Sequence, residues 1–184
     1  MKKSYLIVLA VAVIVIFYSW SAYNRFVTLS ENVDGQWAQV ETQYQRRFDL
    51  IPNLVESVKG IFNQEKEVFG KLADARSKYA GSRNVEDRVR AANEVETALS
   101  RLLVVVENYP QLRSSESVVT LMAQLEGAEN RVSVERSRYN DAVRGFNTAV
   151  KRFPANLLAG LFGFNEKTYF EAASGAENAP AVKF

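Results

Sequence analysis

Apolar residues recur at steps of three and four positions along most of the chain after residue 25. That spacing places them on one face of an α-helix, with charged and amide side chains on the opposite face. Four such stripes predict helices over residues 24–50, 53–79, 85–108 and 116–153. No alternating pattern typical of β-strands is visible between them. The pattern therefore predicts an all-α fold.

Turn and capping residues separate the stripes. Gly81–Asn84 has the composition of a turn. Pro110 disfavours helix at the residue before it, and Pro154 ends the last stripe. Ser114 or Ser115 can cap the last helix by accepting a hydrogen bond from a free backbone N–H. These boundaries agree with helices that follow one another through short connections.

The use of Pro52 decides the topology. The apolar phase continues through it from Ile51 to Val58, which suits one long helix kinked at the proline. The first three predicted helices are, however, of similar length, about 36–40 Å at 1.5 Å per residue, and such helices with short connections pack up-down-up-down. Proline also suits the first turn of a new helix. We therefore predict a tight turn at Leu50–Pro52 and an elongated antiparallel four-helix bundle. Three long helices, the first kinked at Pro52, are the alternative.

The N-terminal segment 4–24, which lies between Lys3 and Arg25, contains no charged residue. About 20 apolar residues cover a hydrocarbon core of roughly 30 Å, and the aromatic residues gather toward both ends, where membrane interfaces favour them. A cleaved signal peptide is the alternative, because Ser19 and Ser21 are small enough for a cleavage site. We expect a transmembrane helix that anchors the protein.

Four parts are expected: a short basic N-terminus at 1–3, the transmembrane helix at 4–24, a helical body at 25–172 and a flexible tail at 173–184. The two lysines of the N-terminus outnumber the one arginine that closely follows the span. The positive-inside rule then favours a cytoplasmic N-terminus. We expect a single-pass protein of the cell membrane with an extracytoplasmic (periplasmic) body.

Composition narrows the possible chemistry. The 184 residues contain no Cys and no His. Disulfides, thiol nucleophiles, the usual Cys/His zinc sites and imidazole catalysis are therefore excluded. The 23 basic and 21 acidic residues give a net charge of only +2, which argues against a dedicated nucleic-acid binder. We expect no cofactor and no metal.

Carboxylates are the remaining candidates for catalysis. A calcium or magnesium site needs clustered oxygen ligands. Glu65 and Glu67 lie on different helix faces, whereas Glu126 and Glu129 share a face with Arg131 close in sequence. We interpret these acids as solvated or salt-bridged helix faces and expect no enzymatic activity. A carboxylate-based or divalent-ion-dependent enzyme is the alternative.

A short apolar segment over residues 157–164 follows the last long helix and is interrupted by Gly160 and Gly163. It is too short to span a bilayer. We expect it to fold back over the end of the bundle. A contact patch for a partner or for the membrane surface is the alternative.

Several motifs, in the same order, resemble those of the LemA family. The central one is Arg46–Val55, which includes Asp49, Pro52 and Asn53. The others are Tyr23-Asn24, Trp37, Glu129-Asn130-Arg131, Arg138-Tyr139-Asn140, Phe146-Asn147, Phe153-Pro154, Leu161-Phe162-Gly163-Phe164 and Tyr169-Phe170. Some family members carry a lipidated cysteine at the start of the body, which this chain lacks.

The resemblance implies a single-pass, membrane-anchored helical bundle from bacteria with no established enzymatic activity. Family members tend to be encoded near membrane metalloproteases and TPM-domain proteins. This implies partners of those classes and a role in envelope stress or membrane protein quality control. A related protein works in magnetosome membranes.

The polar residues of these motifs are candidates for one structural or docking network. Arginine's planar fork suits carboxylates and helix-end carbonyls. We predict that the network fixes the register of the first turn against the last helix, and a docking site for a partner is the alternative. The candidate residues are Arg47, Asp49, Pro52, Asn53, Glu129, Asn130 and Arg131.

Taken together, the sequence predicts a membrane-anchored, non-enzymatic scaffold or adaptor that acts through protein–protein contacts. Such an adaptor predicts only a closed apolar core, whereas an enzyme requires a polar pocket with converging acids. A self-assembling, homo-oligomeric structural protein on the membrane is the third interpretation.

Overall fold

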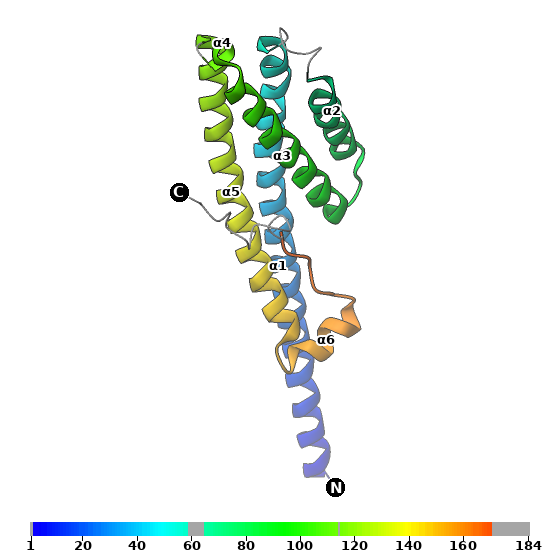
Figure 1. Ribbon diagram of the computed structural model, residues 1–184. Helices are drawn as coiled ribbons and strands as arrows, with labels where there is room; N and C mark the ends of the chain where they lie inside the picture. Colours follow the sequence, from blue (N-terminus) through cyan, green and yellow to red (C-terminus); the bar gives the residue numbers. More distant parts are fainter. Residues whose placement is uncertain (1, 59–64, 114, 171–184) are drawn as a thin grey trace, which may run out of the picture. The chain divides into compact units, whose positions relative to one another are not determined.

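The computed structural model describes residues 2–58, 65–113 and 115–170. Within these ranges the chain forms helices and no strand, so the predicted all-α fold is confirmed (Figure 1). The helices are α1 (Lys2–Ser57), α2 (Lys66–Gly81), α3 (Val85–Asn108), α4 (Pro110–Arg113), α5 (Glu116–Lys151) and α6 (Ala155–Phe162).

Pro52 lies inside α1, and the predicted tight turn at Leu50–Pro52 is wrong. The helix continues through the proline to Ser57, as in the kinked alternative, but a separate α2 of 16 residues follows it. The apolar face of α1 continues past the proline, and its burial outweighs the hydrogen bond that proline cannot donate. The buried residues of that face are Ile51, Leu54 and Val58.

The third and last long helices agree with the sequence. α3 spans the predicted Val85–Asn108, and the side chain of Asn84 caps it by accepting a hydrogen bond of 2.8 Å from the Asp87 amide. α5 begins at Glu116, directly after Ser115. The other predicted cap, Ser114, and the predicted tail at 173–184 lie outside the described residues.

The chain divides into two compact units. The first unit comprises Met1–Gln39 and Arg136–Tyr169, and the second comprises Val40–Glu135 and Phe170–Phe184. The division falls within α1 and α5, so each unit contains one part of both helices. The predicted single body at 25–172 stays a prediction.

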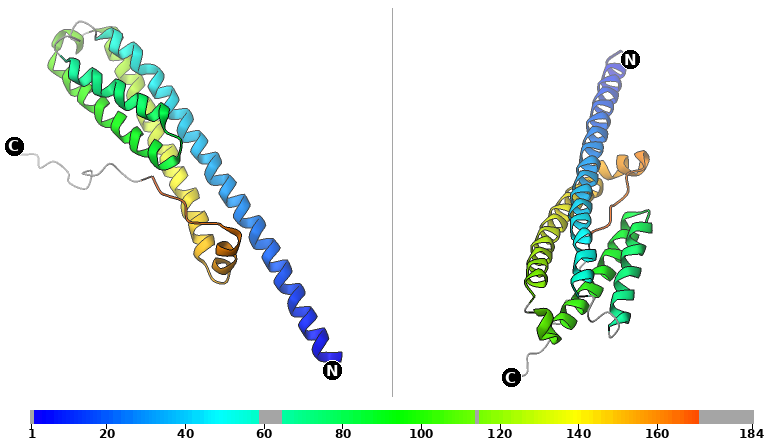
Figure 2. Two further views of the ribbon diagram at one scale, coloured as in Figure 1. Left: turned by 90° about the vertical axis from the view of Figure 1, so that its right-hand side faces the viewer. Right: turned by 90° about the horizontal axis from the view of Figure 1, so that it is seen from above.

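The second unit is an antiparallel bundle of four helical segments. Along the bundle, the C-terminal part of α1 runs up, α2 runs down, α3 runs up and the N-terminal part of α5 runs down (Figure 1). Figure 2 shows α2 and α3 side by side, and they pack directly against each other. The largest fully buried side chains of this core are Val40, Tyr44, Leu54, Val58, Leu72, Val95, Leu99, Leu102 and Val118.

The first unit is built on aromatic contacts. In it, α1 and α5 lie antiparallel, with α6 and the segment that follows beside them (Figure 2). Phe164 lies 5.2 Å from Phe26, 5.8 Å from Tyr23 and 6.3 Å from Phe146, measured between ring centroids. Phe162 lies 5.2 Å from Tyr23 on the same measure. The apolar C-terminal segment therefore folds back onto α1 and α5, as expected.

Candidate functional site

Two of the predicted network residues meet across helices in the second unit. Arg47 of α1 and Glu129 of α5 form an ion pair through Nη1 and Oε2. Arg47 is 7% exposed, while the Glu129 side chain keeps 34% of its surface open to solvent. The Arg47 Nε is buried without a hydrogen-bond partner. Since a charge buried in a core is costly unless it is paired, Glu129 is what makes this arginine tolerable.

The other predicted network residues lie on the surface. Asp49 accepts a hydrogen bond of 2.8 Å from Gln45 Nε2, one turn earlier on the same helix. The Asn53 carbonyl accepts one of 2.8 Å from the Ser57 hydroxyl. The remaining three, Pro52, Asn130 and Arg131, are exposed. The structure thus pairs Arg47 with Glu129, places the exposed Asn130 beside them in the lining of one groove, and leaves the other four residues on the outside of their helices.

The Arg47–Glu129 pair borders an open groove between α3 and α5, with a volume of about 620 Å³. The floor is apolar and includes the flexible thioether of Met122, a side chain that adapts easily to different partners. The apolar residues that line the groove are Leu99, Leu103, Val106, Val118, Val119, Met122, Ala123 and Leu125. This open groove differs from the closed apolar core that the sequence leads us to expect of an adaptor.

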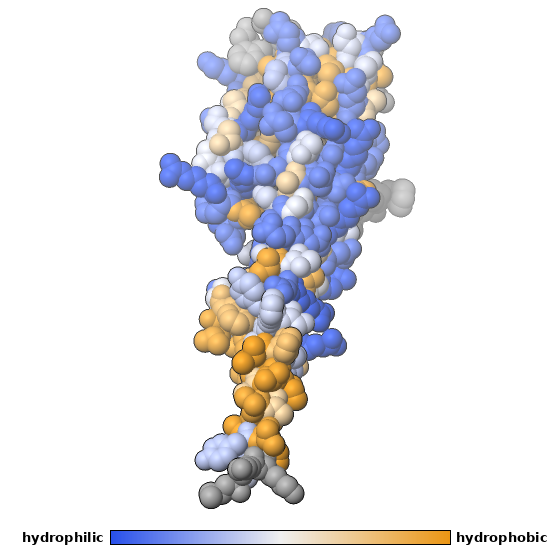
Figure 3. Space-filling view, turned by 180° about the vertical axis from the view of Figure 1, so that it is seen from behind, coloured by the Kyte–Doolittle hydropathy of each residue, from blue (hydrophilic) through white to orange (hydrophobic). Residues whose placement is uncertain are grey.

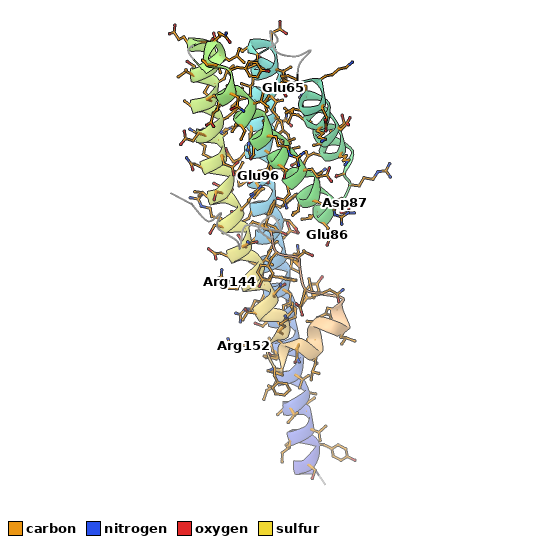
Figure 4. The ribbon with its side chains drawn as sticks, viewed as in Figure 1. Glu65, Glu86, Asp87, Glu96, Arg144 and Arg152 are labelled. Carbon is orange, nitrogen blue, oxygen red and sulfur yellow. The ribbon has the colours of Figure 1, made fainter. Side chains whose placement is uncertain are left out.

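Glutamates surround this groove. Glu96 and Glu107 approach from α3, and Glu126 and Glu129 approach from α5; Glu96 is labelled in Figure 4. They line the walls of the groove, and the described residues contain no group of three or more His, Cys, Asp or Glu placed to hold a metal ion. Chemically, the groove is an apolar trough with acidic edges.

The sequence prediction missed a second polar contact, in the first unit. Asn147 of α5 is 4% exposed and grips the backbone of Lys167 at two points. Its Nδ2 donates to the Lys167 carbonyl at 2.9 Å, and its Oδ1 accepts from the Lys167 amide at 2.8 Å. The Tyr139 hydroxyl donates to the Thr168 carbonyl at 3.0 Å. These bonds fasten the non-helical segment after α6 to α5.

The side chain of Lys167 completes this attachment. Its Nζ lies 2.7 Å from Asp34 Oδ1 and 3.4 Å from the Ser30 carbonyl oxygen, both on α1. The same ammonium lies 5.6 Å from the Phe146 ring centroid. In the sequence, the only signal for this contact is that Asn147 belongs to the Phe146-Asn147 motif. Its partner lies 20 residues away in a segment without periodicity.

Among the described residues, α1 is the one helix long and apolar enough to cross a membrane. Only 6% of its most apolar window is buried. A core helix of a water-soluble domain would be mostly buried instead. Figure 3 shows this apolar surface at the N-terminal end of the first unit.

Comparison with protein-family models identifies the family of this chain. The model of the LemA family matches residues 36–184. The chain belongs to the LemA family. The match begins beyond the apolar part of α1 and covers both the Arg47–Glu129 pair and the Asn147 contact.

Relatives of this LemA-family protein include two magnetosome proteins. Magnetosome protein MamQ 2 of Paramagnetospirillum magneticum is 27% identical over 175 residues, covering 81% of this chain. Magnetosome protein MamQ of Magnetospirillum gryphiswaldense is 27% identical over 174 residues, covering 80% of it. The matches span 64% of either relative's length. Protein LemA of Metamycoplasma hominis is 20% identical over 178 residues, covering 94% of this chain and 80% of the relative.

The family, the magnetosome relatives and the exposed apolar part of α1 together support a membrane-associated helical protein.

Proposed function

We propose that this LemA-family protein is a membrane-anchored helical adaptor of the bacterial envelope that binds partner proteins in the groove between α3 and α5. The observation that carries the proposal is the groove itself, with its apolar floor and glutamate edges. Residues 4–24 would anchor the protein in the membrane, which the exposed apolar surface of α1 supports.

The chemistry of the groove favours one kind of occupant, an amphipathic helix with basic residues beside its apolar stripe. A helix in a groove buries apolar side chains at spacings of three and four residues, which suits a trough running between two helices. Glu107 and Glu126 would face the basic residues and set the orientation and the association rate. Both are exposed, and neither forms an ion pair within the described residues.

The expected topology places the body outside the cytoplasm, because Lys2 and Lys3 precede the span. Under this proposal the partners are envelope proteins, and those that the family resemblance implies, a membrane metalloprotease or a TPM-domain protein, are the first to test. An alkaline phosphatase fused after Phe184 checks the topology, since it is active only outside the cytoplasm. An inactive fusion that is otherwise stable would reverse the orientation.

Site-specific photocrosslinking in intact cells tests the groove. A photoreactive amino acid at Met122, on the floor, should trap a partner, whereas one at Val104, an exposed apolar position of α3 outside the groove, should not. The double substitution Glu107→Lys/Glu126→Lys should reduce the Met122 crosslink roughly ten-fold by repelling the basic helix. Asp74→Lys, at an exposed acid of α2, should leave it unchanged. Equal crosslinking at Met122 and Val104, or no effect of charge reversal, contradicts the proposal.

The two alternatives predict different results. A divalent-ion enzyme requires a measurable affinity of the purified protein for magnesium or calcium that Glu126→Gln abolishes. Self-assembly requires that the Met122 crosslink join two copies of this chain. Either result would replace the adaptor proposal.

A further inference from the structure

The freely exposed part of α1 is shorter than a bilayer. Every residue from Ser4 to Tyr18 is exposed, whereas Ser19 is half-buried and Ala22 is 7% exposed. Those fifteen residues extend about 22 Å at 1.5 Å per residue, against a hydrocarbon core of roughly 30 Å. A span that begins at Ser4 therefore reaches the part of α1 that already packs within the first unit.

The helix beside that part of α1 carries an unusual apolar surface. Ala159, at 2% exposed, faces the protein from α6, while Leu157 and Leu161 are 67% and 77% exposed. Phe153, in the turn just before α6, is 78% exposed as well. On α6 itself, Leu157 and Leu161 lie one turn apart and form an outward apolar stripe. Solvated helices of soluble proteins place polar residues at such positions.

Contacts within the first unit hold this stripe at the level where α1 becomes buried. The Phe162 ring at the end of α6 contacts Tyr23 edge-on. A small hollow of about 150 Å³ lies among α1, the end of α5 and the start of α6, lined by Tyr18, Ser21, Phe153 and Ala155 among others. Figure 3 shows the hydrophobic surface of α1 continuing onto α6.

Two cations lie at the same level. Arg25 and Arg152 both line the hollow and are exposed, and no carboxylate pairs with either among the described residues. Arg152 is labelled in Figure 4. Trp20, five residues before Arg25 on α1, is 64% exposed. An apolar stripe flanked by arginines and by amphipathic aromatic rings is the pattern of a helix lying in a membrane interface.

We propose that α6 lies in the bilayer interface, with Phe153, Leu157 and Leu161 inserted among the acyl chains and Arg25 and Arg152 at the headgroup phosphates. The inference rests on the proposed anchoring of α1 and extends it, because α6 would supply a second membrane contact that fixes the depth of the span. The occupant of the stripe is thus the lipid surface, continuous with the lipid around α1.

The absence of cysteine makes the full-length protein suitable for single-site labelling. Cysteine variants Leu161→Cys, Ile14→Cys and Val134→Cys would carry an environment-sensitive fluorophore in vesicles of phosphatidylcholine and phosphatidylglycerol. Nitroxide lipids with shallow or deep spin labels then report depth. Val134 is the matched control, an apolar residue that is 50% exposed on α5 in the second unit.

We expect the Leu161 probe to be quenched by the shallow nitroxide about two-fold more than the Val134 probe, and the Ile14 probe to be quenched most by the deep one. Leu157→Asp should reduce quenching at Leu161 without changing it at Ile14. Arg25→Gln/Arg152→Gln should remove the dependence of Leu161 quenching on the phosphatidylglycerol content.

The outcomes separate the two proposals. Deep quenching at Ile14 with no quenching at Leu161 overturns the interfacial position of α6 and leaves the anchor intact. No quenching at Ile14 overturns the anchor, and the position of α6 with it. A Leu161 probe that is shielded from aqueous iodide but not quenched by lipid nitroxides would show that a protein covers the stripe, which also contradicts the inference.

Discussion

Among the described residues, each unit buries one charged or amide side chain, and the two are satisfied differently. In the first unit, Asn147 makes two hydrogen bonds to the Lys167 backbone and uses both ends of its amide. In the second unit, Arg47 pairs with Glu129, but its Nε has no hydrogen-bond partner. Asn147 fastens a segment that has no helical bonds of its own. Arg47 joins two helices that would form without it.

The two units also differ in what their ring contacts and ion pairs hold in place. Aromatic edges, Lys167 and the Lys151–Glu166 ion pair hold a non-helical segment in the first unit, whereas in the second unit ion pairs link one regular helix to another. One of those pairs joins Arg88 of α3 to Glu41 of α1, and another joins Lys78 of α2 to Glu94 of α3. The comparison teaches that a buried polar group matters most where the backbone around it lacks regular structure. In such a segment, a buried polar group should have all of its hydrogen-bond donors and acceptors paired.

The largest effect is expected from Asn147→Ala. The substitution leaves the Lys167 amide and carbonyl without their partners and should lower the free energy of unfolding by about 3 kcal/mol. Denaturation of the detergent-solubilised full chain, followed by circular dichroism, measures this. Asn156→Ala, at an exposed asparagine of α6, is the control and should cost less than about 0.5 kcal/mol. Equal effects of the two would refute the difference drawn between the units.

A smaller loss is expected from Arg47→Met. It removes the cation that neutralises a partly buried Glu129 and should cost about 2 kcal/mol. The double substitution Arg47→Met/Glu129→Met should recover most of that loss, because no charge is then stranded. A parallel cycle on Lys78 and Glu94, whose side chains are 62% and 42% exposed, should give a coupling below about 0.5 kcal/mol. If the two cycles gave the same coupling, burial would not be what distinguishes Arg47.

The smallest effect, of opposite sign, is expected from Tyr79→Phe in the second unit. The Tyr79 hydroxyl is buried without a hydrogen-bond partner. The Tyr79 ring lies 5.5 Å from the Tyr44 ring and 4.8 Å from the Phe48 ring, measured between ring centroids. Removing an unpaired buried hydroxyl should stabilise the protein by about 1 kcal/mol at neutral pH.

The same residue predicts a pH dependence. Burial, and then the neighbouring Tyr44, raise the pKa of Tyr79 above its usual value. Its hydroxyl therefore keeps its proton in the folded state at a pH where the unfolded chain ionises, near 10. Stability linked to Tyr79 is fully present below that pH and falls as the pH rises above it. Tyr79→Phe should flatten this alkaline loss, and an unchanged alkaline profile would contradict it.

Local signals explain what could be predicted from the sequence. α3 has the predicted bounds because Asn84 caps it and Pro110 follows its end, both within a few residues of the helix. Similar helix lengths predict a turn at Pro52, whereas the apolar spacing, which is unbroken across the proline, favours one continuous helix. In the fold, burial of Ile51, Leu54 and Val58 outweighs the proline.

The only part of the candidate site that could be predicted from the sequence is the one where residues of opposite charge lie on two regular helices. Arg47 and Glu129 were both singled out, and opposite charges on two regular helices meet once the bundle forms. The groove depends on the side-chain volumes that α3 and α5 bring together, which periodicity does not encode. The Asn147 contact depends on the path of a non-helical segment, for which the sequence holds no repeating signal.

Because the first unit is built from two separate parts of the chain, it can complete its fold only after most of the second unit has been synthesised. Its parts, Met1–Gln39 and Arg136–Tyr169, emerge from the ribosome at the beginning and near the end of synthesis, while most of the second unit is one continuous stretch. Tyr23 and Phe26 must wait for Phe162 and Phe164 before they are covered. Their early exposure is a hazard for a nascent chain in water, and insertion of residues 4–24 into lipid before translation ends would shorten the apolar stretch that stays uncovered.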